Sequence, residues 1–275
     1  MNYFERAKYF RTKKRLGQNF LVDGAVILDI IELAQISPED TVVEIGPGVG
    51  FVTEQLVKHA KEVIAIELDE EAICELEKLN APNLRIIHAD ILKTDLSGLC
   101  EGKVKIVANI PYYITSPIIA HLLGEIDDLQ NQNRGKITEI LLMVQEEVAK
   151  RMAALPESPS KQYGLLSILS QFWAQVEIVR LVGRKSFYPS PKVNSALVKL
   201  NVRETPRLEP LPNFRRVIKA AFSQRRKNIK NCLISGGFAK EKVIAALGSL
   251  GLDENIRGEK LSIEQFGQLS EALND

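Results

Sequence analysis

Short runs rich in valine and isoleucine recur along the first half of the chain, and they constrain its fold more than any other feature. The runs occupy residues 41–45, 63–67, 84–89, 104–109 and 139–145. Their apolar residues are nearly continuous rather than alternating, which is typical of strands covered on both faces. The stretches between the runs carry apolar residues at helical spacing, namely 51–60, 69–79, 115–124 and 146–154. The pattern predicts an α/β fold built on a parallel sheet.

The second half of the chain breaks this alternation. Residues 176–182 and 195–202 are strand-like, and the segment between them is too rich in proline for a helix, so we expect them to close the sheet in antiparallel fashion. Residues 203–212 contain three prolines and mark a linker. Helical spacing then returns in 213–223, 225–234, 239–248 and 262–272. We therefore expect two domains, an α/β domain of residues 1–204 and a small all-α domain of residues 205–275.

Bulk composition excludes several classes of protein. The 275 residues are 45% hydrophobic and 26% charged, and no apolar stretch approaches the ~20 residues of a membrane-spanning helix. The N-terminal segment lacks the apolar core of a secretory signal, so we expect a cytoplasmic location. The cysteines lie far apart without a C-x-x-C pair and the histidines share no spacing, so neither a disulfide framework nor a metal site is indicated. The composition is typical of a soluble protein, and we expect a monomer without a membrane partner.

The net charge of +1 conceals an uneven distribution. Residues 1–15 hold six basic side chains against a single acid, and residues 214–230 hold seven against none. A helix that only stays soluble usually carries both signs, so the second cluster favours contact with nucleic-acid phosphates. Arg225, Arg226 and Lys227 are the residues that we expect to make these contacts. The alternative is that the charges only keep the C-terminal domain soluble.

A glycine-rich turn follows the first predicted strand and opens the next helix. It reads Gly46-Pro47-Gly48-Val49-Gly50, and Glu44 stands two residues before it. Glycines let the backbone turn sharply and let a ligand approach without interference from a Cβ atom. The spacing is G-x-G-x-G rather than the G-x-G-x-x-G of dinucleotide-binding proteins. Taken alone, the turn is also compatible with a tight strand-to-helix connection that binds nothing.

Acidic residues end the next two predicted strands. Glu67 stands where a carboxylate can accept both ribose hydroxyls of an adenosine-containing cofactor, and Asp90 stands where one can accept from the adenine amino group. Either acid alone could be a solvated residue at a strand end. Because the carboxyl ends of parallel strands meet at one edge of a sheet, Gly46, Glu67 and Asp90 together predict a cofactor site.

The fourth predicted strand ends in Asn109-Ile110-Pro111-Tyr112, which indicates a particular chemistry. The exocyclic N6 of adenine is a poor nucleophile because its lone pair is delocalised into the ring. Acceptors for its hydrogens stabilise the charge that develops during methylation, and the Asn109 side-chain oxygen with the carbonyl of Ile110 or Pro111 could supply them. Tyr112 could stack on the base, and Phe187 could close its other face. Alternatively, Phe187 only forms part of a hydrophobic lid over the core.

The motifs resemble those of the bacterial small-subunit ribosomal RNA adenine N6,N6-dimethyltransferases, the kasugamycin-sensitivity methylase family. The likeness covers almost the whole chain. Its segments are LGQNFL (16–21), EIGPGVG (44–50), AIELD (65–69), HADIL (88–92), ANIPYYITSPII (108–119), MVQEEVAKRM (143–152), FYPSPKVNSALVKL (187–200), AAFSQRRKNIKNCL (220–233) and RGEKLSIEQF (257–266). Departures are mild, since Tyr113 stands where many relatives have Asn and Ser190 stands where a third proline is frequent.

The resemblance implies a Rossmann-like, seven-stranded fold of S-adenosylmethionine-dependent methyltransferases with a small all-α C-terminal domain. It implies dimethylation of the N6 groups of two adjacent adenosines near the 3′ end of 16S small-subunit ribosomal RNA, within a pre-30S particle during ribosome biogenesis. The catalytic residues expected are Asn109, Pro111, Tyr112 and Phe187. The family's cofactor contacts fall on Gln18, Asn19, Leu21, Gly46, Glu67, Asp90 and Asn109, of which the first three rest on the resemblance alone.

Three alternatives share parts of this pattern. The large-subunit RNA methylases that confer macrolide resistance have similar motifs, but the C-terminal AAFSQRRKNIKN resembles the small-subunit branch. A non-catalytic nucleic-acid binder on this scaffold has no chemical need for the intact glycines, Glu67, Asp90 and NIPY. An NAD-dependent enzyme or a small-molecule methyltransferase leaves the basic ends unexplained.

Overall fold

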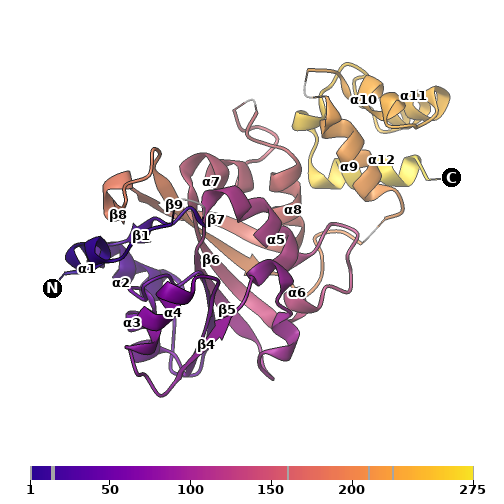
Figure 1. Cartoon of the computed structure of the whole chain (residues 1–275). Helices are drawn as coiled ribbons and strands as arrows, with labels where there is room; N and C mark the ends of the chain where they lie inside the picture. The colour runs from indigo at the N-terminus through magenta and orange to yellow at the C-terminus, as the bar shows by residue number, and fades with distance from the viewer. Residues whose placement is uncertain (1, 14–15, 160, 210, 225, 275) are drawn as a thin grey trace. The chain divides into compact units, whose positions relative to one another are not determined.

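Internal packing divides the chain into two compact units. The computed structural model describes residues 2–13, 16–159, 161–209, 211–224 and 226–274. Unit 1 comprises residues 1–123, 131–149 and 175–202, and unit 2 comprises residues 124–130, 150–174 and 203–275. Figure 1 labels the elements of both units.

A seven-stranded sheet runs through unit 1 in the order β4-β3-β2-β5-β6-β9-β7 (Figure 1). The neighbouring pairs from β4 to β6 are parallel, which confirms the predicted parallel α/β sheet. The strands are β2 (Thr41–Ile45), β3 (Glu62–Glu67), β4 (Leu84–His88), β5 (Val104–Asn109), β6 (Ile137–Gln145), β7 (Ala174–Val182) and β9 (Ser195–Val202).

The sheet closes through β9, which lies between β6 and β7. It pairs antiparallel with β6, from Glu139 opposite Asn201 to Gln145 opposite Ser195. Residues 176–182 and 195–202, which the sequence predicts to close the sheet, fall in β7 and β9, and these strands are neighbours. The antiparallel direction is established for β9 against β6. The central strands are buried on both faces, and this explains their continuous apolar runs, since Val42, Val43, Val63, Ile64 and Ala65 are each 0% exposed.

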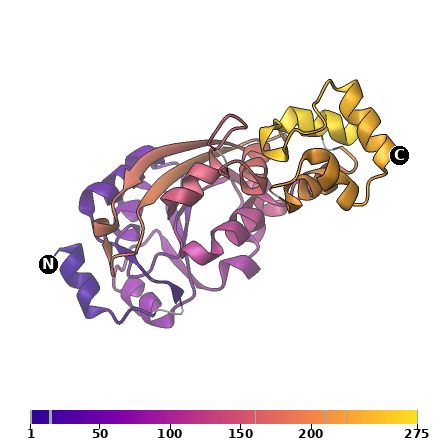
Figure 2. The same cartoon turned by 90° about the horizontal axis from the view of Figure 1, so that it is seen from above.

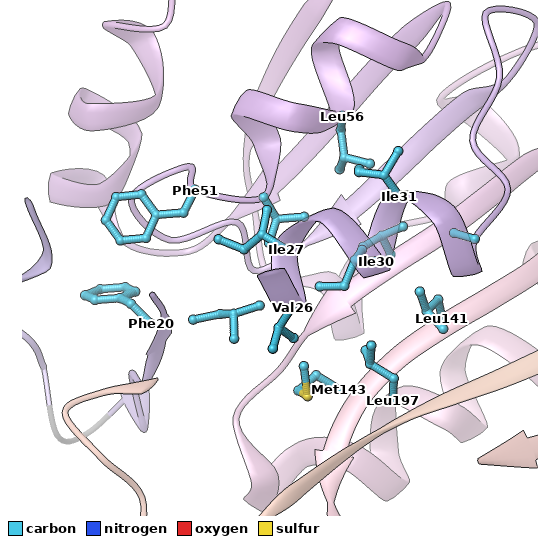
Figure 3. Packing of buried hydrophobic residues seen from close by; sticks show 14 of the residues in the cluster. Phe20, Val26, Ile27, Ile30, Ile31, Phe51, Leu56, Leu141, Met143 and Leu197 are labelled. Carbon is cyan, nitrogen blue, oxygen red and sulfur yellow. The ribbon is translucent and has the colours of Figure 1, made fainter. Parts of the chain in front are cut away.

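Helices cover the sheet and include several that the sequence pattern did not indicate. The helices that begin within unit 1 are α1 (Tyr3–Tyr9), α2 (Gly24–Leu33), α3 (Thr53–His59), α4 (Glu70–Glu77), α5 (Thr115–Leu123), α6 (Gln132–Lys136) and α7 (Glu146–Met152). The structure confirms the four expected helices as α3, α4, α5 and α7. The helix α2 places Val26, Ile27 and Ile30 in one hydrophobic cluster with Leu141 and Met143 of β6 (Figure 3).

A second, two-stranded sheet joins segments that lie far apart in the sequence. Strand β1 (Phe20–Leu21) pairs antiparallel with β8 (Phe187–Tyr188), so that Phe20 lies opposite Tyr188 and Leu21 opposite Phe187. Figure 1 shows these short strands side by side. This pairing fixes residues 16–21 beside the carboxyl edge of the central sheet.

Unit 2 is helical, and its C-terminal part appears in orange to yellow in Figure 2. Its helices are α8 (Leu165–Trp173), α9 (Phe214–Ser223), α10 (Ile229–Ser235), α11 (Lys240–Ser249) and α12 (Ile263–Ala272). The unit takes in α8, because Phe172 packs against Phe214 with ring centroids 5.5 Å apart. The functional division at residues 204 and 205 stays a prediction. Among the described residues no helix has the length and apolar character needed to cross a bilayer.

Candidate active site

A cavity lies at the carboxyl ends of the parallel strands, with about 1090 Å³ of empty space that is partly open to solvent. Its lining comes from unit 1 alone. The lining residues are 16–21, 44–49, 51–52, 66–68, 89–91, 109–114 and Ile118. The structure thus brings Gly46, Glu67, Asp90 and Asn109 together around one space, which is large enough for a nucleoside-sized ligand.

The glycine turn after β2 requires glycine at two positions for different reasons. Gly46 has a φ of +68°, which L side chains rarely adopt, and its N–H donates to the Ile66 carbonyl at 3.0 Å. Gly48 has a φ of +57°, and a Cβ atom there would lie 2.8 Å from the Phe20 ring. The turn is therefore held between β3 and the N-terminal arm, by which we mean residues 11–13 and 16–21.

Glu67 ends β3 and is 8% exposed. Its Oε2 accepts the Gly48 N–H at 2.9 Å, and its Oε1 accepts the N–H groups of Leu68 and Asp69, each at 2.8 Å. Burial raises the pKa of the carboxyl, and these backbone donors oppose the rise. A carboxylate offers about four acceptor positions, so Oε2 keeps one for a hydroxyl in the cavity. The contact of Glu67 with both hydroxyls of a ribose stays a prediction, and Oε2 is the oxygen that has an acceptor position left for it.

Glu44 is a buried acid on the cavity wall to which sequence reasoning gave no role. It is 3% exposed, and its Oε2 accepts the Thr53 hydroxyl at 2.6 Å. Burial raises the pKa of Glu44 to about 8. The carboxyl is therefore mostly protonated at neutral pH. The signal that could have identified it is an acid inside a strand that is otherwise continuously apolar.

Asp90 follows β4, is partly exposed and lines the cavity. Its Oδ1 accepts the Leu92 N–H at 3.0 Å and caps the short 3-10 helix η2 (Ile91–Lys93). The cap fixes the carboxylate at the strand end and uses one oxygen. Oδ2 is the atom left for an amino group in the cavity.

Asn109 ends β5, and the N-terminal arm orients its amide. Its Nδ2 donates to the Asn19 carbonyl in a long hydrogen bond of 3.4 Å. This bond uses the donor side of the amide and leaves the acceptor Oδ1 for a partner in the cavity. Asn19 is itself fixed because its Nδ2 donates to the Gly17 carbonyl at 3.0 Å.

Tyr112 begins the 3-10 helix η4 (Tyr112–Ile114) and is anchored by its hydroxyl. The hydroxyl lies 2.7 Å from Oγ of Ser195, which is 0% exposed at the start of β9. Burial raises the pKa of the phenol, so the ring stays neutral. The Pro111 carbonyl accepts the Ile114 N–H at 3.2 Å, which makes the Ile110 carbonyl the simpler second acceptor for an amino group.

Phe187 is placed differently from the sequence expectation. It is 2% exposed, belongs to the hydrophobic cluster of unit 1 and does not line the cavity. The reason is the pairing of β1 with β8, which sets Phe187 opposite Leu21. Its position corresponds to the alternative interpretation, a lid over the core. Stacking of Phe187 on a base stays a prediction that would require this pairing to rearrange.

The three arm residues that rested on the resemblance all line the cavity. Leu21 contributes an apolar wall and is 2% exposed. Gln18, in contrast, uses both ends of its amide within the protein. Its Nε2 donates to Asp69 Oδ2 at 2.7 Å, and its Oε1 accepts the Lys13 N–H at 2.7 Å. The geometry indicates that Gln18 holds the arm in place.

The basic stretch 214–230 is only partly free to meet phosphates. Arg215 pairs with Glu125 and Asp127 at 3.3 and 3.4 Å, and Lys230 pairs with Glu254 at 2.6 Å. The guanidinium of Arg216 donates to the Gly236 and Gly237 carbonyls and lies 4.1 Å from the centroid of the Phe238 ring.

Arg226 and Lys227, the two described residues of the proposed RNA contact, lie between α9 and α10. The expected helix 225–234 begins at Ile229, because Asn228 caps it by accepting the Asn231 N–H at 3.0 Å. Arg226 and Lys227 are exposed on the preceding turn. Arg225 lies outside the described residues. Across the described chain, no group of three or more His, Cys, Asp or Glu side chains is arranged to hold a metal ion.

The sheet order and the acceptors at its carboxyl edge define the class of S-adenosylmethionine-dependent methyltransferases. Two solved structures share the fold. The 23S ribosomal RNA methyltransferase ErmE has a TM-score of 0.69 at 28% identity, covering 93% of this chain and 99% of its own. A dimethyladenosine transferase from Plasmodium falciparum has a TM-score of 0.74 at 29% identity, covering 90% of this chain and 94% of its own.

The chain belongs to the ribosomal RNA adenine dimethylase family, which it matches over residues 9–275. The ribosomal RNA small subunit methyltransferase A of Clostridium botulinum (strain Loch Maree / Type A3) is 44% identical, covering 97% of this chain and 95% of the relative. The protein of the same name from Moorella thermoacetica is 43% identical, covering 98% of this chain and 94% of the relative.

Proposed function

We propose that this protein transfers methyl groups from S-adenosylmethionine to the N6 atoms of two adjacent adenosines near the 3′ end of 16S small-subunit ribosomal RNA. Each adenosine becomes N6,N6-dimethyladenosine, and the substrate is a pre-30S particle in the cytoplasm. The protein acts as a monomer. The observation that carries the proposal is that Asn109 presents an amide oxygen to the same cavity that holds Glu67 and the glycine turn.

The residues of the cavity fit S-adenosylmethionine. The remaining acceptor position on Glu67 Oε2 suits a ribose hydroxyl, and Asp90 Oδ2 suits the adenine amino group. The backbone of the glycine turn is open to a close approach, since a Cβ atom at Gly46 would have its nearest neighbour, the Asn109 carbonyl, at 3.8 Å. When bound, the cofactor supplies the methyl group.

The protein's own residues act on the acceptor nitrogen. Oδ1 of Asn109 and the Ile110 carbonyl accept the two hydrogens of an adenine N6, which draws the nitrogen lone pair out of the ring and stabilises the positive charge that develops. A carbon–nitrogen bond forms as the carbon–sulfur bond breaks, and one N6 proton leaves to water. The second N6 hydrogen permits the second methylation. The ring of Tyr112, anchored through Ser195, supports one face of the base.

We favour small-subunit RNA over large-subunit RNA as the proposed substrate because of the relatives' degrees of identity. The two relatives named small subunit methyltransferase A are 43 and 44% identical over nearly their full length, whereas the 23S methyltransferase structure is 28% identical. Methylation of large-subunit RNA is the second candidate, because that structure covers 93% of this chain.

The test is transfer of tritium from methyl-labelled S-adenosylmethionine to three substrates: unmethylated small ribosomal subunits, large subunits and protein-free RNA. We expect label in the small subunits, recovered as N6,N6-dimethyladenosine after digestion. Preferential labelling of large subunits would replace the proposal with the second candidate. Absence of label from all three, with intact cofactor binding, would contradict the catalytic role.

A further inference from the structure

We infer that Asp69 is a positioning residue that locks the N-terminal arm against the cofactor cavity through Lys13 and Gln18, and so limits the rate at which cofactor and product leave. The inference deepens the proposed function, on which it rests for the identity of the cofactor.

The side chain of Asp69 is 0% exposed, and it accepts hydrogen bonds both from the N-terminal arm and from the start of α4. Its Oδ1 lies 2.5 Å from Lys13 Nζ and also accepts the Glu71 N–H at 3.1 Å, which caps α4. Its Oδ2 accepts Nε2 of Gln18 at 2.7 Å. A carboxylate removed from water needs such donors, because an unpaired buried charge is strongly unfavourable. The arm residues Lys13 and Gln18 supply them.

We call the contacts of Asp69 with Lys13 and Gln18 the lock. On the side of the N-terminal arm, the lock is directly connected to the cavity wall. Gln18 accepts the Lys13 N–H at 2.7 Å, so the two arm residues that contact Asp69 are also hydrogen-bonded to each other. The residues that follow, from Gln18 to Leu21, line the cavity. Asn19 among them accepts from Asn109, and the Phe20 ring packs on Gly48. Release of the lock would therefore loosen the wall on which the cofactor site depends.

The other side of the lock is continuous with Glu67. The N–H of Asp69 donates to Glu67 Oε1 at 2.8 Å, so the same residue that holds the arm also positions the proposed ribose acceptor. Lys13 has a second partner in Glu71 at 3.0 Å. The lysine lowers the pKa of the Asp69 carboxyl, together with Gln18, against the effect of burial. Asp69 thus stays charged when the lock is closed.

Dimethylation makes product exchange important, since each adenosine takes two methyl groups and the spent cofactor must leave between transfers. When the arm is closed, it retains S-adenosylmethionine during methyl transfer. When the arm is open, it releases the spent cofactor, S-adenosylhomocysteine. Loss of one charge-assisted contact should shift this balance toward the open arm by roughly tenfold or more.

The variants are Lys13→Met, which keeps the side-chain stem, and Gln18→Leu, which removes both amide contacts. Lys13→Arg should restore the ion pair. Lys78→Met is the matched control, because Lys78 forms an ion pair with Glu75 at 2.6 Å and is not part of the cavity wall. Melting temperatures near that of the wild type establish that each variant is folded.

Two measurements test the lock without RNA. Hydrogen–deuterium exchange of the cofactor-free protein should become about tenfold or more faster across residues 16–21 in Lys13→Met and Gln18→Leu. The dissociation rate of S-adenosylhomocysteine, followed by stopped-flow competition, should rise by a similar factor. Lys13→Arg and Lys78→Met should match the wild type in both.

Wild-type exchange and wild-type dissociation in both folded variants would overturn the inference. Faster exchange with unchanged dissociation would also overturn it, because the arm would then not control release. Neither result bears on the proposed function, which is tested separately by methylation of small ribosomal subunits compared with large subunits and protein-free RNA. If the protein binds S-adenosylhomocysteine but does not methylate ribosomal subunits, the inference about Asp69 is not contradicted.

Discussion

Asn109 owes its orientation to a main-chain carbonyl of the arm rather than to another side chain. The contact with Asn19 spans 90 positions of the sequence and fixes which end of the amide meets the cavity. An asparagine at a strand end can be recognised from sequence, but the direction of its amide cannot.

Replacement of Asn109 by alanine removes the acceptor proposed for the N6 hydrogens. We expect kcat to fall by about 10² or more, because a preorganised polar contact acts mainly on the transition state. Affinity for S-adenosylhomocysteine should change far less. Single-turnover methyl transfer and calorimetry would separate the two effects. Near-wild-type turnover would exclude the acceptor role.

Glu44 makes stability depend on pH in a particular direction. Its pKa is about 8 in the folded protein against an ordinary value of 4.5, so between these values the folded state holds a proton that the unfolded state has lost. The contribution of Glu44 to the free energy of unfolding is therefore fully present below pH 4.5 and is lost as pH rises through 8.

Glu44→Gln should flatten this dependence, since the amide stays neutral and can still accept from Thr53. We expect the wild type to lose on the order of 3 kcal/mol relative to the variant between pH 5 and 8, at up to about 1.4 kcal/mol per pH unit. Urea unfolding across this range measures it, with the exposed Glu77→Gln as control. Parallel profiles for wild type and Glu44→Gln would show that the acid is not held neutral.

At the scale of elements, the residues between α9 and α10 include two exposed members of the basic stretch, Arg226 and Lys227. Two other basic residues of the stretch already have acidic partners, since Arg215 and Lys230 form ion pairs within unit 2. The sequence shows seven basic residues without an acid, but the acids that neutralise some of them come from distant segments. Arg226 and Lys227 are the described members of the predicted RNA contact that this arrangement leaves exposed.

The double variant Arg226→Gln with Lys227→Gln should weaken binding to the small subunit and flatten the plot of log K against log salt by up to about 2 units, because each phosphate contact releases counterions. Filter binding over a range of salt concentrations measures this. Lys58→Gln with Lys61→Gln is the control, since both side chains are exposed and precede β3, away from the carboxyl edge of the sheet. An unaltered slope in the first variant would place the RNA contacts elsewhere, for example on the basic residues from Arg6 to Arg15.

At the scale of the whole molecule, the cofactor cavity is built within unit 1. Its lining comes from the arm and from the ends of β2, β3, β4 and β5, and all of these belong to that unit. The helices α9 to α12 belong to unit 2. Cofactor binding and RNA binding are therefore expected to be separable.

Saturating S-adenosylhomocysteine should slow hydrogen–deuterium exchange at residues 16–21 and 44–52, while exchange in α11 and α12 stays unchanged. A ligand protects the amides whose opening would destroy its site, and distant helices gain nothing from it. Mass-spectrometric exchange with and without the ligand measures this. Protection of α11 or α12 would show that the two units are energetically coupled.

The sequence by itself determined the parallel strands, most covering helices, the glycine turn and the acids at the strand ends. These features follow from local rules: the period of apolar residues, the backbone freedom of glycine and the meeting of parallel strand ends at one edge. The positions of Glu67, Asp90 and Asn109 around one cavity could be inferred in the same way.

Only the tertiary structure decided how distant segments meet. The pairing of β1 with β8 buried Phe187, the packing around β2 made Glu44 a neutral acid, and Asp69 gained its partners from an arm more than 50 residues away. Burial and pairing depend on which surfaces face one another across the folded chain. No local pattern records that choice, because the same side chain is charged or neutral, free or held, according to the neighbours that the fold gives it.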